Sequence, residues 1–309
     1  MTQYTYSACL ENAYKVNWRI ADVLGDRRFD PARRWMPLAL SGAATVTCLD
    51  DHGKRALTQV EMAAYAHLFG YVEEFIAPTV NALAADFAVA DRVAFDALTN
   101  FAAEEVKHMR LFRAVRERVD RELGFETRLL PGERDTARFV RSKSRGAVLL
   151  LTAAIEWFTQ RHYTDSIKDD AGLDGLTQRI FEAHWMEEAQ HAKLDHLETV
   201  RAFEGLTPEE KDVAVTDLIE LVAAVHGLLV QQVENDIVNL GRVLRRTFTA
   251  AEHAELSREI LRAKRWTFLL SGVTHPRFEE LLVEVTTPAQ RERIGAALEG
   301  LLAEAPAAA

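Results

Sequence analysis

The stretch His184-Trp185-Met186-Glu187-Glu188-Ala189-Gln190-His191 decides the fold that we predict for this chain. Side chains three and four residues apart are neighbours on a helix, so His184, Glu188 and His191 share one face. Two imidazoles and a carboxylate that converge in this way are typical ligands of a metal ion. A single Glu-x-x-His pair is more often part of a solvated acidic helix, and the rest of the chain distinguishes the two interpretations.

The chain holds a second Glu-x-x-His pair, and one glutamate on an apolar helix face precedes each pair. The six residues follow the order Glu, Glu-x-x-His, Glu, Glu-x-x-His: Glu73, Glu105, His108, Glu156, Glu188 and His191. In each half, 32 residues separate the single glutamate from the glutamate of the pair. This spacing suits two antiparallel helix pairs with all ligands at one height, and the 51 residues between the halves leave room for a crossover.

Four carboxylates and two imidazoles in this arrangement hold two iron or manganese ions in ferritin-like bundles. Four glutamates buried without a cation would be costly, because desolvation opposes the charged form of each carboxylate. The residue types, their faces and their spacing therefore predict a di-metal centre inside a helical core. His184 is additional to the six: it is either a seventh ligand that gives one ion a further nitrogen, or a histidine of the surrounding core.

The chain reads as nearly all helix, because its 309 residues include only 15 glycines and 8 prolines and show almost no alternating β pattern. We predict an all-α fold, a ferritin-like four-helix bundle with a crossover connection and additional C-terminal helices. One domain, 1–309, would comprise an N-terminal arm (1–57), a metal-binding core (58–203) and additional helices (204–302). The core helices are expected at 58–87, 91–123, 143–168 and 176–203, and the later helices at 207–247, 249–272 and 277–302.

Two details of this prediction concern the first helix and the crossover. Thr58 and Glu61 have the spacing of a capping box at the start of the first core helix. The crossover, 125–142, carries a short basic cluster between Arg134 and Arg145 that we interpret as part of a solvated connection. An irregular arm with a short helix near 10–24 is expected before the core.

Composition limits the classes of partner. A net charge of −10 and an isoelectric point near 5.5 argue against a nucleic-acid-binding surface. Only Cys9 and Cys48 are present, which fits a reducing compartment. No secretory signal is recognised after Met1, and the apolar run 147–155 is too short to span a bilayer. We expect a cytoplasmic protein that binds neither nucleic acid nor membrane.

The ligand pattern resembles a known family. The segments His184-x-x-x-Glu188-x-x-His191, Glu105-x-x-His108 and Glu73-Glu74-Phe75-Ile76-Ala77, together with Glu156, are similar to the non-haem di-iron N-oxygenases of the p-aminobenzoate N-oxygenase type, which convert aryl amines into nitro compounds. The resemblance covers 58–203 and, in outline, the two following helices. It implies seven metal ligands: Glu73, Glu105, His108, Glu156, His184, Glu188 and His191. It also implies two iron ions as cofactor, with manganese possible, and dioxygen as co-substrate.

Three functions remain open at this point. The leading hypothesis is a di-iron oxygenase that oxidises a small organic molecule at an amine nitrogen, with an external electron donor and a homodimeric assembly. The length beyond Phe203 favours it, because extra helices can enclose a substrate pocket. The alternative is a ferritin-like protein that handles iron or reduces peroxide without an organic substrate, although the Cys-x-x-Cys pairs expected of such proteins are absent. A helical binding protein with a structural metal is the third.

Other residues carry weaker signals. Glu104 and Glu187 each precede a ligand glutamate and can orient the ligand histidines, but a solvated side chain is the expected state of both. Tyr163 and His226 are expected in the core rather than at the metals. No catalytic residue beyond the metal ligands is predicted.

Overall fold

The computed structural model describes residues 4–303, which form helices and no strand. The α-helices are α1 Tyr6–Lys15, α2 Ile20–Val23, α3 Leu38–Ser41, α4 Asp51–Phe87, α5 Arg92–Leu123, α6 Glu133–Arg141, α7 Arg145–His162, α8 Gly175–Glu204, α9 Pro208–Leu244, α10 Ala250–Arg265, α11 Ser271–Val273, α12 Pro276–Val285 and α13 Pro288–Ala303. Two π-helical turns, η1 Tyr163–Ile167 and η2 Trp266–Leu270, continue α7 and α10. The prediction of an all-α fold is confirmed.

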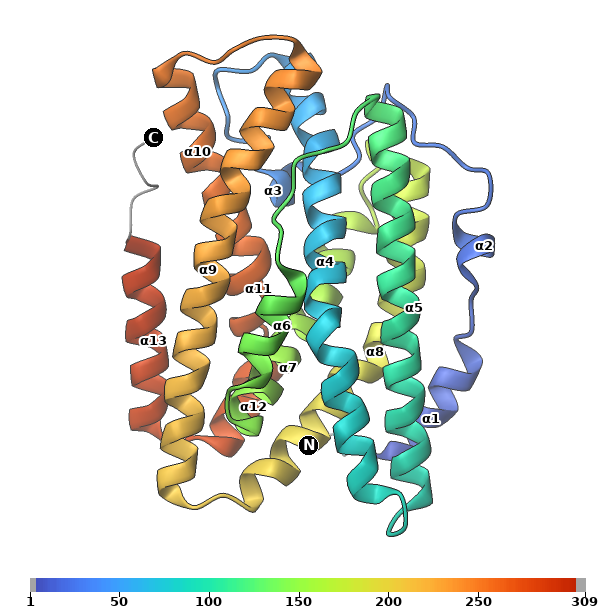
Figure 1. Ribbon diagram of the computed structural model, residues 1–309, viewed down its shortest axis with the longest axis vertical. Coiled ribbons are helices and arrows are strands. Elements are labelled where there is room, and N and C mark those ends of the chain that lie inside the picture. The colour runs from blue at the N-terminus through green and yellow to red at the C-terminus, as the bar shows by residue number, and fades with distance from the viewer. Residues whose placement is uncertain (1–3, 304–309) are drawn as a thin grey trace.

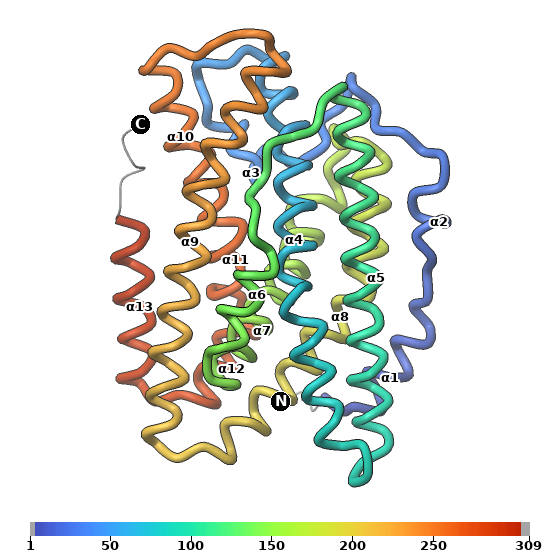
Figure 2. Tube along the Cα trace, in the orientation of Figure 1, coloured from blue at the N-terminus to red at the C-terminus, as the bar shows by residue number. Residues whose placement is uncertain are grey.

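Four long helices, α4, α5, α7 and α8, form the central bundle (Figure 1). A short turn joins α4 to α5, so these two helices run antiparallel and pack along their length. A second antiparallel pair, α7 and α8, follows after the crossover that contains α6. The tube in Figure 2 shows α9 beside α4 and α13 outside α9. Two helix pairs linked by a crossover are the arrangement that the spacing of the ligands predicts.

Helix α4 begins seven residues before the predicted start. Asp50 caps it by accepting a hydrogen bond from the Gly53 backbone N–H. The predicted capping box is wrong, because Thr58 and Glu61 lie buried within the helix. Asp50 supplies a complete N-cap upstream, so the helix has no reason to begin at a later polar residue.

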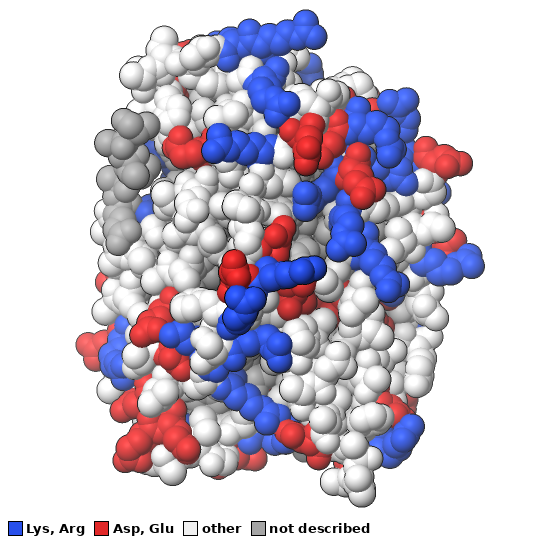
Figure 3. Space-filling view, viewed as in Figure 1, with Lys and Arg blue, Asp and Glu red and all other residues white. Residues whose placement is uncertain are grey.

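The other core boundaries agree closely with the prediction. Asp91 caps α5 and Asp174 caps α8, while α5 ends at Gly124 in the left-handed conformation, φ 78°. The crossover differs, since it contains the nine-residue helix α6, which buries Ala137 and Val140. This helix has one narrow apolar stripe among arginines, a pattern that a solvated connection can also show. Figure 3 shows basic side chains over α5 and α6, with acidic side chains among them.

The additional helices cover one side of the bundle. The capping box of Thr207 and Glu210 starts α9, which packs against α4, α7, α10 and α13. The predicted last helix is divided into α12 and α13 around Thr286 and Thr287. Within residues 4–303, one helix, α9, is long and apolar enough to cross a membrane by length and composition alone. The core helix of a soluble protein passes the same test.

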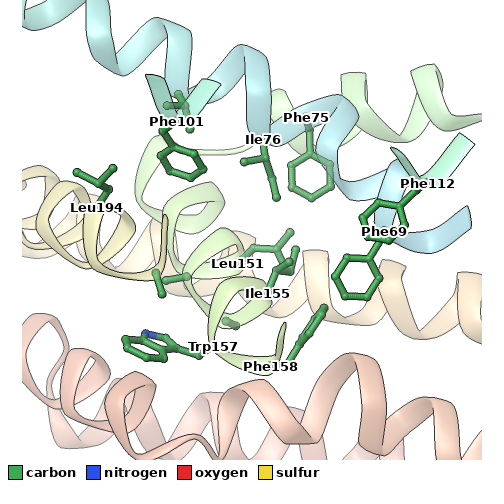
Figure 4. Close-up of a cluster of buried hydrophobic side chains, with 14 of the residues drawn as sticks. Phe69, Phe75, Ile76, Phe101, Phe112, Leu151, Ile155, Trp157, Phe158 and Leu194 are labelled. Atoms are coloured by element: carbon green, nitrogen blue, oxygen red, sulfur yellow. The ribbon is translucent and has the colours of Figure 1, made fainter. Parts of the chain in front are cut away.

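The bundle interior is apolar and rich in aromatic rings (Figure 4). The labelled side chains of Figure 4 come from all four core helices: Phe69, Phe75, Ile76, Phe101, Phe112, Leu151, Ile155, Trp157, Phe158 and Leu194. Buried carboxylates placed in such surroundings require compensating charges.

Candidate metal centre

The four core helices bring the seven predicted ligands together in the interior. Helix α4 carries one, α5 two, α7 one and α8 three, and each is at most 3% exposed: Glu73, Glu105, His108, Glu156, His184, Glu188 and His191. The helical periodicity explains this placement, because residues three and four apart on α5 and α8 project from one face. Glu74, which points to the other side of α4, is only partly buried and lines a surface pocket beside α6.

Potential ligand atoms form two overlapping groups. One consists of Glu73, His108, His184 and Glu188, and the other of Glu105, His108, Glu188 and His191. Within each group the atoms lie within 4.8 Å of one another. His108 and Glu188 belong to both groups. The two oxygens of Glu188 can serve two adjacent ions, whereas His108 offers only Nδ1 and can bind one of them. Glu156 lies outside both groups, and its carboxyl is hydrogen-bonded to that of Glu188.

The two histidines of the Glu-x-x-His pairs direct Nδ1 toward the centre. His191 Nδ1 lies 2.8 Å from Glu105 Oε1 and 2.8 Å from Glu188 Oε2. His108 Nδ1 lies 3.1 Å from Glu188 Oε1. The distances place nitrogen and carboxylate oxygens around common points, where a cation can bind all of them.

The opposite nitrogen of each ring is held by a carboxylate. His108 Nε2 lies 2.8 Å from Glu187 Oε2, and His191 Nε2 lies 2.8 Å from Glu104 Oε2. Lys107 also donates to Glu187. With Nε2–H donating to the carboxylate, Nδ1 presents its lone pair to a metal.

The expectation that Glu104 and Glu187 are solvated is wrong, because they are 8% and 0% exposed. Each one precedes the ligand glutamate of one pair and holds the histidine of the other pair, so the contact runs between α5 and α8. A signal was present in the sequence, since both glutamates have the same one-residue offset from a ligand. This offset alone does not predict which histidine each glutamate contacts.

His184 lies among the ligand atoms rather than in a separate part of the core. Its Nε2 is 3.8 Å from Glu73 Oε1 and also contacts Glu188. Phe69 and Phe112 pack nearly perpendicular to the imidazole, with ring centroids 5.3 and 4.8 Å away. Burial lowers the pKa of His184, which keeps the ring neutral, the form that binds metals. This position supports a seventh ligand.

When no cation is bound, protons must neutralise the negative charge of the buried carboxylates. Burial, followed by the neighbouring Glu105, raises the pKa of Glu73 well above its usual value. Burial and the neighbouring Glu188 do the same for Glu156. Burial acts to lower the pKa of His108, but the surrounding carboxylates, Glu188 first, raise it well above its usual value.

Several buried ligand atoms make no well-directed hydrogen bond among the described residues, although other ligand atoms lie close to some of them: Glu73 Oε2, Glu105 Oε1, Glu156 Oε2, His108 Nδ1 and His184 Nε2. Buried polar atoms are nearly always paired, so this concentration of unpaired donors and acceptors needs an explanation. Two divalent cations would neutralise four glutamates and coordinate these atoms. The residues present therefore fit a di-metal cofactor, and carboxylate with imidazole suits iron or manganese.

Aromatic rings cover the histidines. Phe101 stacks on His191 with ring centroids 3.9 Å apart. Trp18 stacks on His108 at 5.9 Å and 12°, and the Lys107 ammonium lies 4.1 Å from the Trp18 ring centroid. Trp18 was not predicted, because it belongs to the link between α1 and α2 and no spacing relates it to the ligands.

The weaker candidates lie in other parts of the core. Tyr163, in η1, stacks on Trp185 at 4.7 Å. His226, on α9, accepts a 3.0 Å hydrogen bond from Arg265 Nε. Both are buried, as expected for core residues.

Comparison with known proteins identifies the family. The family model described as p-aminobenzoate N-oxygenase AurF matches residues 10–268. No match is found among curated proteins. Among solved structures, a tyrosine-to-phenylalanine variant of an R2-like ligand-binding oxidase with an aerobically reconstituted Mn/Fe cofactor has 16% identity and a TM-score of 0.45, over 85% of this chain and 93% of that one. A second variant, with an anaerobically reconstituted Mn/Fe cofactor, has 14% identity and a TM-score of 0.44, over 92% and 94%.

The family match confirms the resemblance seen in the ligand pattern and, with the helical bundle, the ferritin-like fold. It spans both halves of the ligand set. The chain belongs to the p-aminobenzoate N-oxygenase family and is a dioxygen-dependent oxidoreductase with a di-metal cofactor.

Proposed function

We propose that the protein is a di-iron monooxygenase that transfers one oxygen atom from dioxygen to the amine nitrogen of a small organic molecule. The two iron ions are bound by Glu73, Glu105, His108, Glu156, His184, Glu188 and His191. An amine is the proposed substrate because the family is described by an N-oxygenase. The protein is further proposed to be cytoplasmic and homodimeric and to take electrons from a separate donor.

The observation that carries the proposal is the pair of adjacent ligand groups that overlap at the carboxylate of Glu188. A structural metal needs one closed set of ligands, whereas two adjacent ions with shared ligands can act together on one molecule of dioxygen. The extra histidine, His184, adds a nitrogen without adding negative charge. It distinguishes this centre from one built only of the six common ligands.

The protein residues position and shield the centre. Bound iron supplies the redox chemistry of dioxygen activation. Glu104 and Glu187 fix the tautomer and orientation of His191 and His108. The Phe101 and Trp18 rings cover the imidazoles and limit access of water to them. Limited water access strengthens electrostatic interactions inside the site and suppresses side reactions.

The test is anaerobic loading with Fe²⁺, followed by metal analysis and addition of dioxygen. We expect two iron ions per chain and, with a panel of aryl and alkyl amines, a product that contains one atom from ¹⁸O₂ by mass spectrometry. One ion or none after careful loading would refute the di-iron centre. Two ions with dioxygen consumption but no oxidised amine would favour the alternative of iron handling or peroxide reduction.

A matched pair of variants tests the ligand assignment on α4. Glu73→Ala should bind fewer metal ions than the parent, because a carboxylate of the inner face is lost. Glu74→Ala should retain two, because this side chain lies at the surface beside α6. Equal loss of metal in the two variants would show that the assignment of helix faces is wrong.

A further inference from the structure

Two more carboxylic residues lie buried on the ligand face of α8. Asp195 and Glu198 follow His191 by four and seven residues and are 1% and 0% exposed. At 1.5 Å per residue they are about 6 and 10 Å further along the helix axis than His191. Neither residue belongs to the two ligand groups, and buried carboxyls outside a metal centre need another role.

Asp195 occupies the position between the centre and the end of the bundle. The Thr152 hydroxyl faces it from α7, and its Oδ2 has no hydrogen-bond partner among the described residues. The ionisable groups that act on it are His191 and Glu198 on its own helix and Glu105 on α5. An unpaired buried carboxyl oxygen in this position is suited to exchange a proton with a neighbour or an intervening water.

Glu198 connects this interior to the surface. The Tyr6 hydroxyl on α1 donates to Glu198 Oε1, and Arg201 Nε lies 3.2 Å from Glu198 Oε2. Tyr6 and Arg201 line a groove of about 1120 Å³ between α8, α12 and the N-terminal arm. The groove thus gives solvent contact to a residue that is hydrogen-bonded to a fully buried carboxylate.

We propose that Tyr6, Glu198 and Asp195 form a proton relay from this groove to the metal centre. The inference rests on the proposed function, because a monooxygenase consumes protons. Substrate, O₂, two electrons and two protons give the oxygenated substrate and one water, with the electrons from the external donor. For each proton delivered, Asp195 releases its carboxylic proton toward the centre. Tyr6 and Glu198 then pass a proton from the groove to Asp195, which returns it to the protonated form.

The protonation state of Asp195 agrees with this role. Burial is the largest cause that raises the pKa of Asp195, to about 8, which favours the protonated acid. Glu198, one turn further, accepts hydrogen bonds from Tyr6 and Arg201 and supplies an acceptor on the path inward. Asp195 and Glu198 are three residues apart on one face of α8, so a direct contact or one intervening water can carry a proton between them.

The first experiment measures this proton directly, without relying on activity. In the anaerobic, Fe²⁺-loaded protein at pH 7, infrared spectroscopy should show a carboxylic C=O band that shifts in D₂O. Asp195→Asn should remove one component of this absorption and leave the component of the buried Glu61 acid. His196→Gln, next to Asp195 in sequence and directed at the groove, should retain both components. Absence of a band that depends on Asp195 would overturn the proposal, whatever the protein does with an amine.

The second experiment measures proton delivery. Asp195→Asn should slow the reaction of the reduced, loaded protein with dioxygen on the order of 100-fold, the usual size of a lost proton-transfer group. Tyr6→Phe should slow it less, because water in the groove can replace the hydroxyl. The solvent deuterium isotope effect should rise in both variants. An unchanged rate and isotope effect in Asp195→Asn with two iron ions bound would overturn the relay.

The two proposals fail in different ways. A protein that binds two ions and shows the Asp195 band, but oxidises no amine, contradicts the proposed function and not the protonated Asp195. An Asp195→Asn variant that oxidises an amine at the rate of the parent contradicts the relay alone.

Discussion

His184 is the proposed ligand that this centre has in addition to the six common ones. Its Nε2 is buried, makes no well-directed hydrogen bond among residues 4–303 and lies next to Glu73 and Glu188. An imidazole adds electron donation to a metal without altering the charge of the cage. It should therefore influence reactivity more than metal binding.

We predict that His184→Ala retains two iron ions and its helical content, because the four glutamates and two other histidines remain. The optical spectrum that forms when dioxygen is added to the reduced protein should change, or should decay faster than in the parent. Stopped-flow absorption measures both. A spectrum and decay like those of the parent would make His184 a core residue, and loss of both ions would show that it holds the site together.

A second prediction concerns Glu187, which holds the His108 ring and the Lys107 ammonium. Glu187→Ala leaves both donors without this acceptor, and loss of such an orienting carboxylate typically weakens metal binding 10- to 100-fold. Competition with a chelator measures the affinity. Glu182→Ala, an exposed glutamate on the same helix, is the control and should bind as the parent does. Equal affinities in the two variants would contradict an orienting role.

Packing between elements places a second buried charge cluster away from the metals. Lys264 on α10 lies 2.6 Å from Glu61 Oε2 on α4 and 2.9 Å from Asp236 Oδ2 on α9. Gln232 donates to Asp236 and accepts from the Leu130 backbone N–H, which ties the crossover to α9. The cluster joins the additional helices to the metal-binding bundle through a few polar contacts.

At the element scale, we predict that Lys264→Met lowers the free energy of unfolding by about 3–5 kcal/mol, because it leaves two buried carboxyls without their cation. Chemical denaturation at pH 7 measures the change. Arg262→Met, which removes an exposed cation on the same helix, should alter stability little. Similar losses in the two variants would contradict the importance of burial.

The same cluster predicts a dependence of stability on pH. Burial and then Asp236 raise the pKa of Glu61 to about 8, so the folded protein holds a proton that the unfolded chain loses above its usual pKa of 4.5. The free energy of unfolding should therefore fall as pH rises through about 8. Glu61→Gln should reduce this slope, as measured by denaturation at pH 5.5 and 8.5. An unchanged slope would assign the pH dependence to other groups.

At the scale of the whole molecule, the four core helices converge on one cluster of charges, so metal binding and folding are linked. The proposed ligands come from α4, α5, α7 and α8, so cations would bind the folded arrangement and not the unfolded chain. Free metal at 100 times its dissociation constant adds about 2.7 kcal/mol to the free energy of unfolding.

We predict that removing iron with a chelator lowers the melting temperature while the helical content stays high, because the apolar core and protons on Glu73 and Glu156 maintain the bundle. Circular dichroism follows both properties. The melting temperature of the Glu73→Ala variant should fall less on chelation than that of the parent, because the variant holds less metal. Equal melting temperatures with and without iron would show that the centre does not contribute to stability.

The sequence alone determined the helical class, the order of the four core helices and which acidic and histidine residues they bring together in the interior. All three follow from local periodicity, since residues three, four and 32 apart fall on predictable faces and heights of helices. Only the tertiary structure decided which side chains meet between helices. Glu104 and Glu187 exchange partners between α5 and α8, Trp18 covers His108, and Tyr6 reaches Glu198. These contacts depend on how helices and the N-terminal arm pack against one another, and a periodicity within one helix contains no information about its neighbour.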